Sequence, residues 1–201
     1  MLRITPYLGI SVVLVSIAGL WYPLLGYFLP IVFASLLIIS PFRGRWFCGN
    51  LCPRGSYHDF WLGKISANRR MPGGLRSLWI RVPIFVAMMS FMITRVVSAH
   101  GAINKTGMVF VSMCLTTTLI STLFGIILSP RAWCAFCPMG TIQRFLGANK
   151  NILKISDKCT KCGICTKVCP MQLNVSEIRV KPDCIKCGRC VSACPANALS
   201  L

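Results

Sequence analysis

A long segment without charge limits the fold of this chain more than any other feature. From Ile4 to Phe42 there is no Lys, Arg, Asp or Glu, and most residues are apolar. A helix needs about 20 residues to cross the hydrocarbon core of a bilayer, so this segment is too long for one span and suits two. We therefore expect a membrane protein with helices over 5–22 and 25–41. The first helix is expected to be retained, because no clear signal-peptide cleavage site follows it.

Two later segments, 78–97 and 107–128, are also apolar and long enough to span. The expected total is four transmembrane helices. Arg81 and Arg95 lie near opposite ends of the third helix, where long side chains can reach the lipid headgroups. The loop 42–77 holds seven basic residues and one acid, so the positive-inside rule places it in the cytoplasm together with both termini.

The charge of the chain agrees with this topology. Its 22 basic and 4 acidic residues give a formal charge of +18, and hydrophobic residues make up 55% of it. The basic residues gather mostly in two blocks that follow apolar segments, which is typical of membrane topology. We expect contact with membrane lipid and no nucleic-acid partner.

Beyond residue 150 the apolar segments end and two cysteine runs follow. They read "CTKCGICTKVCP" and "CIKCGRCVSACP", and both have the spacing C-x2-C-x2-C-x3-C-P. Four thiolates hold a [4Fe–4S] cluster, and in such tandem runs the fourth cysteine binds the cluster of the other run. The expected ligand sets are Cys159, Cys162, Cys165 and Cys194 for one cluster, and Cys184, Cys187, Cys190 and Cys169 for the other. A zinc-binding or disulfide-bonded knot is less favoured, because zinc sites use fewer cysteines at wider spacing.

These runs define a small C-terminal α+β ferredoxin domain over 151–201, after a membrane domain over 1–150. Such a short segment builds little core, so its clusters are expected to hold it together. Basic residues outnumber acids around the runs; they are Lys158, Lys161, Lys167, Arg179, Lys181, Lys186 and Arg189. Two explanations stay open for this excess: charge compensation with a face toward anionic lipid, and an acidic protein partner.

Two further cysteine pairs follow the second and the fourth expected span. They are Cys48 and Cys52 in the cytoplasmic loop 42–77, and Cys134 and Cys137 in the cytoplasmic loop 130–150. Each pair is followed by Pro and Gly, so the unit of two helices and a cysteine loop occurs twice, which predicts two parallel repeats. If the pairs meet, they supply the four thiolates of a third iron–sulfur cluster. Redox-active thiols and a structural metal remain alternatives.

No catalytic residue is expected. His58 and His100 are lone loop histidines, which are more often solvated than catalytic. Cys114 lies in the middle of an expected span and is interpreted as a small packing residue.

The layout resembles the polyferredoxin membrane proteins of the NapH, NosR and CcoG type. The resemblance rests on two C-x2/3-C-P pairs after paired membrane helices and on the C-terminal two-cluster ferredoxin. It implies an electron-transfer subunit in the inner membrane that relays single electrons between a membrane donor or acceptor, such as quinol, and a partner redox enzyme or membrane complex. The cluster domain would face the cytoplasm.

Two alternatives to this function remain open. One is a membrane reductase that serves cofactor or metal assembly, for example of copper, with Met88, Met89, Met92 and Met113 as soft ligands. The other is a structural anchor without redox activity, which eight well-spaced ligand cysteines make less favoured.

Overall fold

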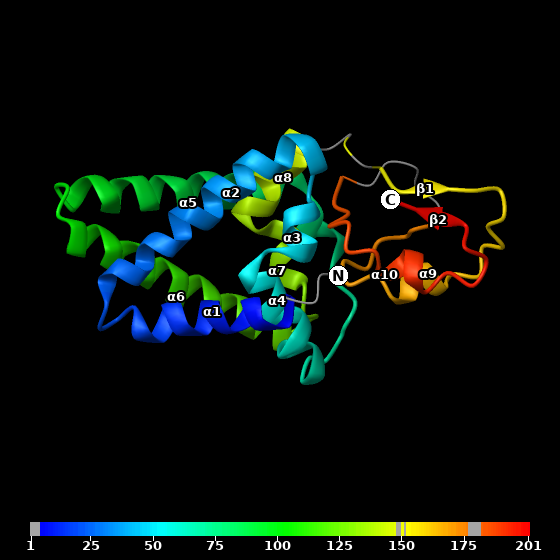
Figure 1. Cartoon of the computed structure of the whole chain (residues 1–201), viewed down its shortest axis with the longest axis horizontal. Coiled ribbons are helices and arrows are strands. Elements are labelled where there is room, and N and C mark those ends of the chain that lie inside the picture. Colours follow the sequence, from blue (N-terminus) through cyan, green and yellow to red (C-terminus); the bar gives the residue numbers. More distant parts are fainter. Residues whose placement is uncertain (1–4, 148–149, 151, 177–181) are drawn as a thin grey trace.

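A computed structural model describes residues 5–147, 150, 152–176 and 182–201, and most of them are helical. Three segments are long and apolar enough to cross a membrane. They are Pro23–Arg43, which comprises the 3-10 helix η1 (Pro23–Tyr27) and α2 (Phe28–Arg43), then α5 (Leu78–Ser98) and α6 (Ile103–Ile127). These long helices form one end of the molecule (Figure 1).

The first expected span is shorter than predicted. Helix α1 covers Thr5–Ala18, which is 14 residues. At about 1.5 Å per residue it is about 21 Å long, less than the roughly 30 Å of a hydrocarbon core. A turn over 19–22 ends the helix, and α1 lies against α6 and against α4 (Pro53–Phe60). Three of the four expected spans are therefore found in the part of the chain that the structure describes.

The outer faces of the long helices are apolar. More than half of the side-chain surface is exposed at Ile31, Ile38, Phe91, Leu119 and Leu123. A continuous apolar exterior of this kind is unfavourable in water and favourable against lipid tails. The three helices thus indicate association with a membrane.

Short helices cover the other end of the long ones. Helices α3 (Trp46–Asn50) and α4 follow α2, and helices α7 (Ala132–Phe136) and α8 (Pro138–Gly147) follow α6. In each pair the second helix begins at the proline after a cysteine, as the sequence predicts, because proline costs little at the first helical position. Two 3-10 helices, η2 (Leu62–Lys64) and η3 (Gly73–Arg76), connect α4 to α5.

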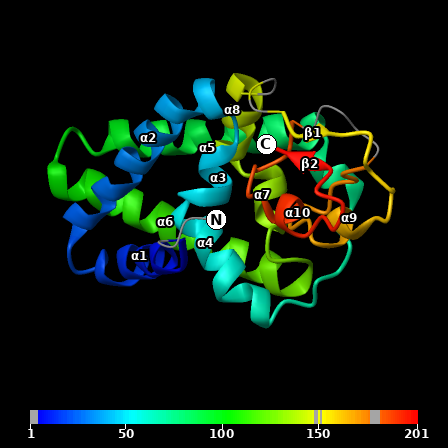
Figure 2. The ribbon, with the colours of Figure 1, turned by 45° about the vertical axis from the view of Figure 1, so that its right-hand side comes forward.

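The C-terminal segment contains two strands and two short helices (Figure 2). Strand β1 (Lys154–Ile155) pairs antiparallel with β2 (Leu199–Ser200), and the helices are α9 (Ile164–Lys167) and α10 (Arg189–Ser192). The two cysteine runs share one turn conformation: φ is +54° at Lys161 and +52° at Lys186. The small core of the segment consists of Leu153, Val175 and Leu199, and cysteines of both runs pack against it.

A buried acid joins this segment to the membrane part. Asp183 accepts hydrogen bonds from Arg45 (2.9 Å), Arg81 (2.7 Å) and Arg144 (2.6 Å). The expectation that Arg81 reaches the headgroups is therefore wrong: its side chain is fully buried against the C-terminal segment. A buried arginine needs a counter-charge, because an uncompensated buried charge is strongly unfavourable, and Asp183 supplies it.

The backbones of the two parts also touch. A Cβ added at Gly49 of α3 would collide with the carbonyl oxygen of Ile185. Asn50 donates a hydrogen bond to the carbonyl of Lys186 at 3.3 Å. The cysteine loop of the membrane part is thus packed directly on the second cysteine run.

Candidate functional site

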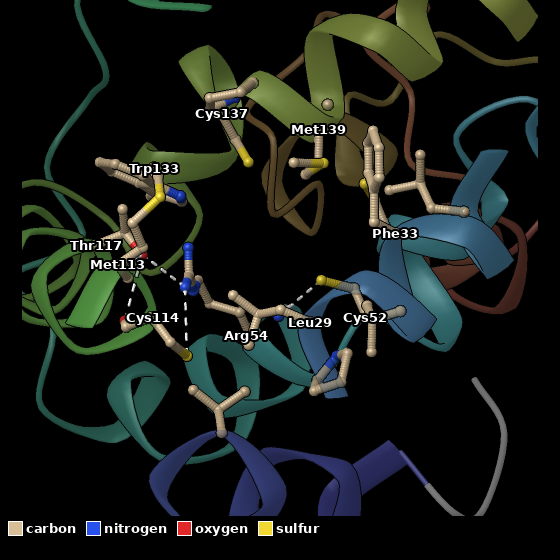
Figure 3. Close-up of a pocket in the computed structure, with 18 of the residues that line it drawn as sticks. Leu29, Phe33, Cys52, Arg54, Met113, Cys114, Thr117, Trp133, Cys137 and Met139 are labelled. Carbon is tan, nitrogen blue, oxygen red and sulfur yellow. Dashed lines mark hydrogen bonds between the residues drawn. The ribbon is translucent and has the colours of Figure 1, made fainter. Parts of the chain in front are cut away.

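The four membrane-side cysteines line one cavity of about 300 Å³. Cys48 and Cys134 belong to α3 and α7, and Cys52 and Cys137 directly precede α4 and α8. Figure 3 shows Cys52 and Cys137 pointing toward the same space from opposite sides. The structure therefore brings together the two pairs that lie in separate loops of the sequence. We call these four residues the membrane cysteine set.

Two arginines link the halves of this set reciprocally. Arg131, three residues before Cys134, donates a hydrogen bond to the carbonyl of Cys48 at 2.8 Å. Arg45, three residues before Cys48, donates one to the carbonyl of Cys134 at 3.0 Å. Each half thus supplies an arginine that fixes the cysteine backbone of the other half.

Two glycines make room for these arginines. A Cβ at Gly55 would lie 2.7 Å from a guanidinium nitrogen of Arg131, and a Cβ at Gly140 would lie 2.6 Å from one of Arg45. Both distances are shorter than real Cβ contacts. The glycine three residues after the second cysteine of each pair therefore permits a close approach of the arginine, which would have to shift for any larger residue.

Both of these arginines are buried, and each forms an ion pair with an acid. Arg131 forms two hydrogen bonds with Asp59, at 2.9 and 2.8 Å, and Arg45 pairs with Asp183. Burial by itself would raise the pKa of each carboxyl, but the neighbouring arginines outweigh it and hold both pKa values below their usual range. Each buried cation therefore faces an ionised acid.

The structural role of these two acids is not predicted from the sequence. They are two of only four acids in a chain with 22 basic residues, and that scarcity is the signal that could have indicated a structural role.

Arg54 differs from the other two arginines. It lines the same cavity, donates to the Thr117 hydroxyl at 2.8 Å, and lies 4.0 Å from the Cys114 sulfur (Figure 3). Among the described residues, no carboxylate forms an ion pair with it. A cation without a counter-charge at the wall of a mainly apolar cavity favours an anionic occupant.

The rest of the cavity wall is apolar. Leu29 and Phe33 of α2 and Phe110 of α6 contribute to it (Figure 3 labels the first two). The four methionines singled out in the sequence, Met88, Met89, Met92 and Met113, also line it. The cavity therefore opens from the cysteines toward the membrane helices.

Burial controls the chemistry of the membrane cysteines. It raises the pKa of Cys48, Cys52 and Cys137, because a thiolate loses its hydration there. The Cys48 thiol donates a hydrogen bond to the side chain of Gln143 at 2.7 Å. Gln143 is fully buried, and no pattern in the sequence predicts this contact. Such thiols are poor nucleophiles, but metal binding would deprotonate them.

The eight C-terminal cysteines fall around two further cavities. One is lined by Cys159, Cys162, Cys165 and Cys194, and the other by Cys169, Cys184, Cys187 and Cys190. These groups are the two ligand sets expected from the spacing. We call them the first and the second ferredoxin set.

None of the three cysteine sets is arranged to bind a single metal ion. No group of three His, Cys, Asp or Glu side chains within the described residues is close enough to hold one metal ion. A [4Fe–4S] cluster does not require its cysteines to meet at one ion, because each thiolate binds a different iron.

The second ferredoxin set lies beside the membrane cysteine set. One buried cluster contains Cys48 and Trp133 together with Met171 and Ile185 of the C-terminal segment. Cys134, Cys137, Cys169 and Cys187 pack against this cluster. Cysteines of the second set and of the membrane set therefore share one apolar contact region.

His58, His100 and Cys114, which lie outside the three cysteine sets, differ in burial. His58 was expected to be solvated, which is wrong: it is fully buried, and burial, assisted by Arg131 and Arg54, lowers its pKa to about 3. His100 is exposed in the turn between α5 and α6, as expected. Cys114 is buried against Val12 and Val15 and also lines the cavity.

Comparisons with known families agree with this geometry. Residues 25–72 and 107–156 match a family described as a 4Fe-4S binding domain, and each segment holds one membrane cysteine pair. Residues 151–195 match a 4Fe-4S dicluster domain that contains both ferredoxin sets. The chain is an iron–sulfur protein. Its domains are those of metal-binding electron-transport proteins.

One relative is an uncharacterized protein of Methanocaldococcus jannaschii. This iron–sulfur protein is 28% identical to it over 155 residues, which cover 71% of this chain and 65% of the relative. The chain thus spans just under two thirds of the relative's length. No solved structure matches the chain.

Proposed function

We propose that this iron–sulfur protein is a membrane-bound relay for single electrons, with a membrane part over 1–150 and a ferredoxin part over 151–201. The observation that carries the proposal is the shared cavity of the membrane cysteine set, which lies next to the second ferredoxin set. A relay requires redox centres at close spacing, and the order of the three cysteine sets along the molecule provides places for them.

The ferredoxin part is proposed to hold two [4Fe–4S] clusters, one in each ferredoxin set. The fit rests on the cavities, each of which is lined by four cysteines from both runs. When bound, such clusters supply one-electron oxidation and reduction. The protein fixes the spacing of these clusters and their exposure to solvent.

The membrane cysteine set is proposed to hold a third iron–sulfur cluster. Four cysteines line the cavity, and Arg54 places a positive charge there that no described carboxylate balances. Iron–sulfur clusters with four thiolates are anionic, so the donors and the charge both fit. Arg45 and Arg131 would fix the cysteine backbone, and the apolar wall would exclude water.

The order of the relay follows from packing. The second ferredoxin set contacts the membrane set through the cluster around Trp133, while the first set lies beyond it. Two acids hold this arrangement. Asp183 of the ferredoxin part pairs with Arg45 and Arg81 of the membrane part. Asp59 of the membrane part pairs with Arg189 of the ferredoxin part. Electrons would pass between the membrane set, the second ferredoxin set and the first.

The orientation in the membrane and the redox partners are also part of the proposal. The ferredoxin part faces the cytoplasm, because the basic loop 42–77 favours that side. The membrane cavity would exchange electrons with a membrane donor or acceptor, for which the resemblance to the NapH, NosR and CcoG type suggests quinol. The partners would be redox subunits or a membrane complex.

An EPR redox titration tests the relay. Anaerobically purified protein is compared with Cys48→Ala/Cys134→Ala. We expect a third spin system in the wild type, magnetically coupled to a ferredoxin signal and absent from the variant, while both ferredoxin signals persist. Identical spectra for the two proteins would contradict the proposal.

A second candidate is a reductase that serves copper assembly, and one observation favours it. Met88, Met89, Met92 and Met113 all line the cavity that contains the cysteines, and thioethers suit Cu(I). Copper binding to purified protein should then fall in Met88→Leu/Met92→Leu and stay unchanged in Met108→Leu, a methionine outside the cavity wall. Equal binding by all three proteins would contradict this candidate.

A further inference from the structure

The first ferredoxin set is the most exposed cysteine set of the molecule. All 13 cysteines lie in the described part, and Cys162 alone among them is exposed. It sits between Lys161 and Ile164, which are exposed as well. Electron exchange with a soluble protein needs a short path from the surface to a redox centre, and Cys162 provides the shortest one.

The surface around Cys162 is basic. We define the distal face as the exposed residues of 154–167. It carries four lysines, Lys154, Lys158, Lys161 and Lys167, and one acid, Asp157. Neither Lys158 nor Lys161 forms an ion pair with a described residue. Their charge is therefore available to a partner.

Other basic residues of this segment are used internally. Lys186 is buried and donates to the carbonyl of Arg43 at 3.1 Å, and Arg189 pairs with Asp59 at 2.8 Å. Arg179 and Lys181 lie outside the described residues. The basic excess seen in the sequence thus divides into an internal part, which joins the two domains, and the distal face.

The position of the distal face argues against lipid. Residues 156–162 lie at the end of the molecule farthest from the long helices (Figure 1). The attraction of an anionic lipid surface decays within a Debye length, about 8 Å at physiological salt. A face turned away from the bilayer gains little from that attraction.

From this we infer that the distal face is the docking surface for a soluble, acidic one-electron carrier protein. The inference rests on the proposed function, because it needs a cluster in the first ferredoxin set. The carrier centre loses one electron, the centre in the first set gains it, and no proton or bond changes. Charge complementarity would speed the encounter, and a small, transient interface suffices for electron transfer.

Stopped-flow kinetics test this inference. The full-length protein is placed in zwitterionic nanodiscs and mixed with a chemically reduced, acidic soluble ferredoxin as the donor. In Lys158→Glu/Lys161→Glu, we expect the second-order rate constant to fall by about tenfold at low ionic strength. The difference should vanish at high salt, because screening removes the steering.

A matched control changes the same amount of charge elsewhere. Arg95→Glu/Lys105→Glu alters two exposed basic residues on either side of the turn between α5 and α6, and the rate should change less than twofold. Equal slowing in both variants would overturn the inference in favour of overall charge. An effect that appears only in nanodiscs with anionic lipid would overturn it in favour of lipid contact.

Iron content and EPR signals are measured first for every variant. If both ferredoxin signals are present and the rate is insensitive to charge reversal, the docking inference fails and the relay stands. If the signals are absent from the wild type, the proposed function itself fails.

Discussion

The two ferredoxin sets draw all their cysteines from the short segment between Cys159 and Cys194, whereas the membrane set joins two loops that are far apart in the sequence. The first ferredoxin set reaches the surface at Cys162, which is exposed. The membrane set is enclosed by apolar side chains and by arginines with buried counter-charges. We therefore expect the first kind of site to depend on its cofactor for folding, and the second to depend on the packing of two halves.

Removal of iron should give the largest difference between the two regions. With a chelator under reducing conditions, we expect residues 151–201 to unfold completely, because a segment this small has little core without its clusters. The long helices should keep their structure, since lipid and packing support them. Limited proteolysis with circular dichroism reports both effects. A C-terminal segment that stays protease-resistant without iron would break the comparison.

Asp183→Asn tests how the regions are joined. The substitution leaves Arg45 and Arg81 buried without their counter-charge, and such a loss costs about 3–5 kcal/mol. We expect the C-terminal segment to detach, with faster hydrogen exchange around Ile185. The control is Asp157→Asn, an exposed acid whose loss should change stability by less than about 0.5 kcal/mol. Equal behaviour of the two variants would show that the ion pairs do not hold the parts together.

Gly55→Ala and Gly140→Ala test the reciprocal contacts of the membrane set. Each added methyl group would collide with an arginine of the other half, which should cost about 1–3 kcal/mol in thermal stability. Gly55→Ala should lose more than Gly140→Ala, because its Cβ would also lie 2.9 Å from the carbonyl oxygen of Cys48, whereas the carbonyl oxygen of Cys134 lies 3.4 Å from a Cβ at Gly140. Gly73→Ala is the control, since no atom lies within 4 Å of its added Cβ. Unchanged stability of both variants relative to this control would show that the close approaches of the arginines do not hold the two halves together.

Arg54→Met should give the smallest effect, confined to the membrane set. Loss of the unbalanced cation should lower the reduction potential of the third cluster, because a positive charge favours the reduced, more negative form. Arg54→Lys should keep most of the potential, and the ferredoxin potentials should stay unchanged in both. Potentiometric EPR measures all of them. A ferredoxin potential that moves as much as the third would contradict a local role for Arg54.

The sequence predicts the local features well. The spacing of the two cysteine runs predicts the grouping of the cysteines around the two C-terminal cavities, and three of the four spans expected from apolar length are found among the described residues. The proline after Cys52 and Cys137 predicts the start of α4 and α8. The helix positions depend on interactions within a few residues, and the cysteine grouping is a known property of such tandem runs.

The missed features depend on tertiary contacts. Arg81 has the pattern of a residue at a membrane interface, and only the approach of Asp183, about 100 positions later, makes it a buried ion pair. His58 is buried because α4 packs on α6, which its neighbours in the sequence do not reveal. The 14-residue length of α1 likewise reflects where the chain turns to follow α6.

Iron and acid-labile sulfide per chain test the central claim most directly, which is that the membrane cysteines hold a cluster. We expect about 12 irons in anaerobically purified wild type and about 8 in Cys48→Ala/Cys134→Ala, with Cys114→Ala equal to the wild type. About 8 irons in all three proteins would mean that only the ferredoxin clusters exist, and would contradict a relay that begins in the membrane.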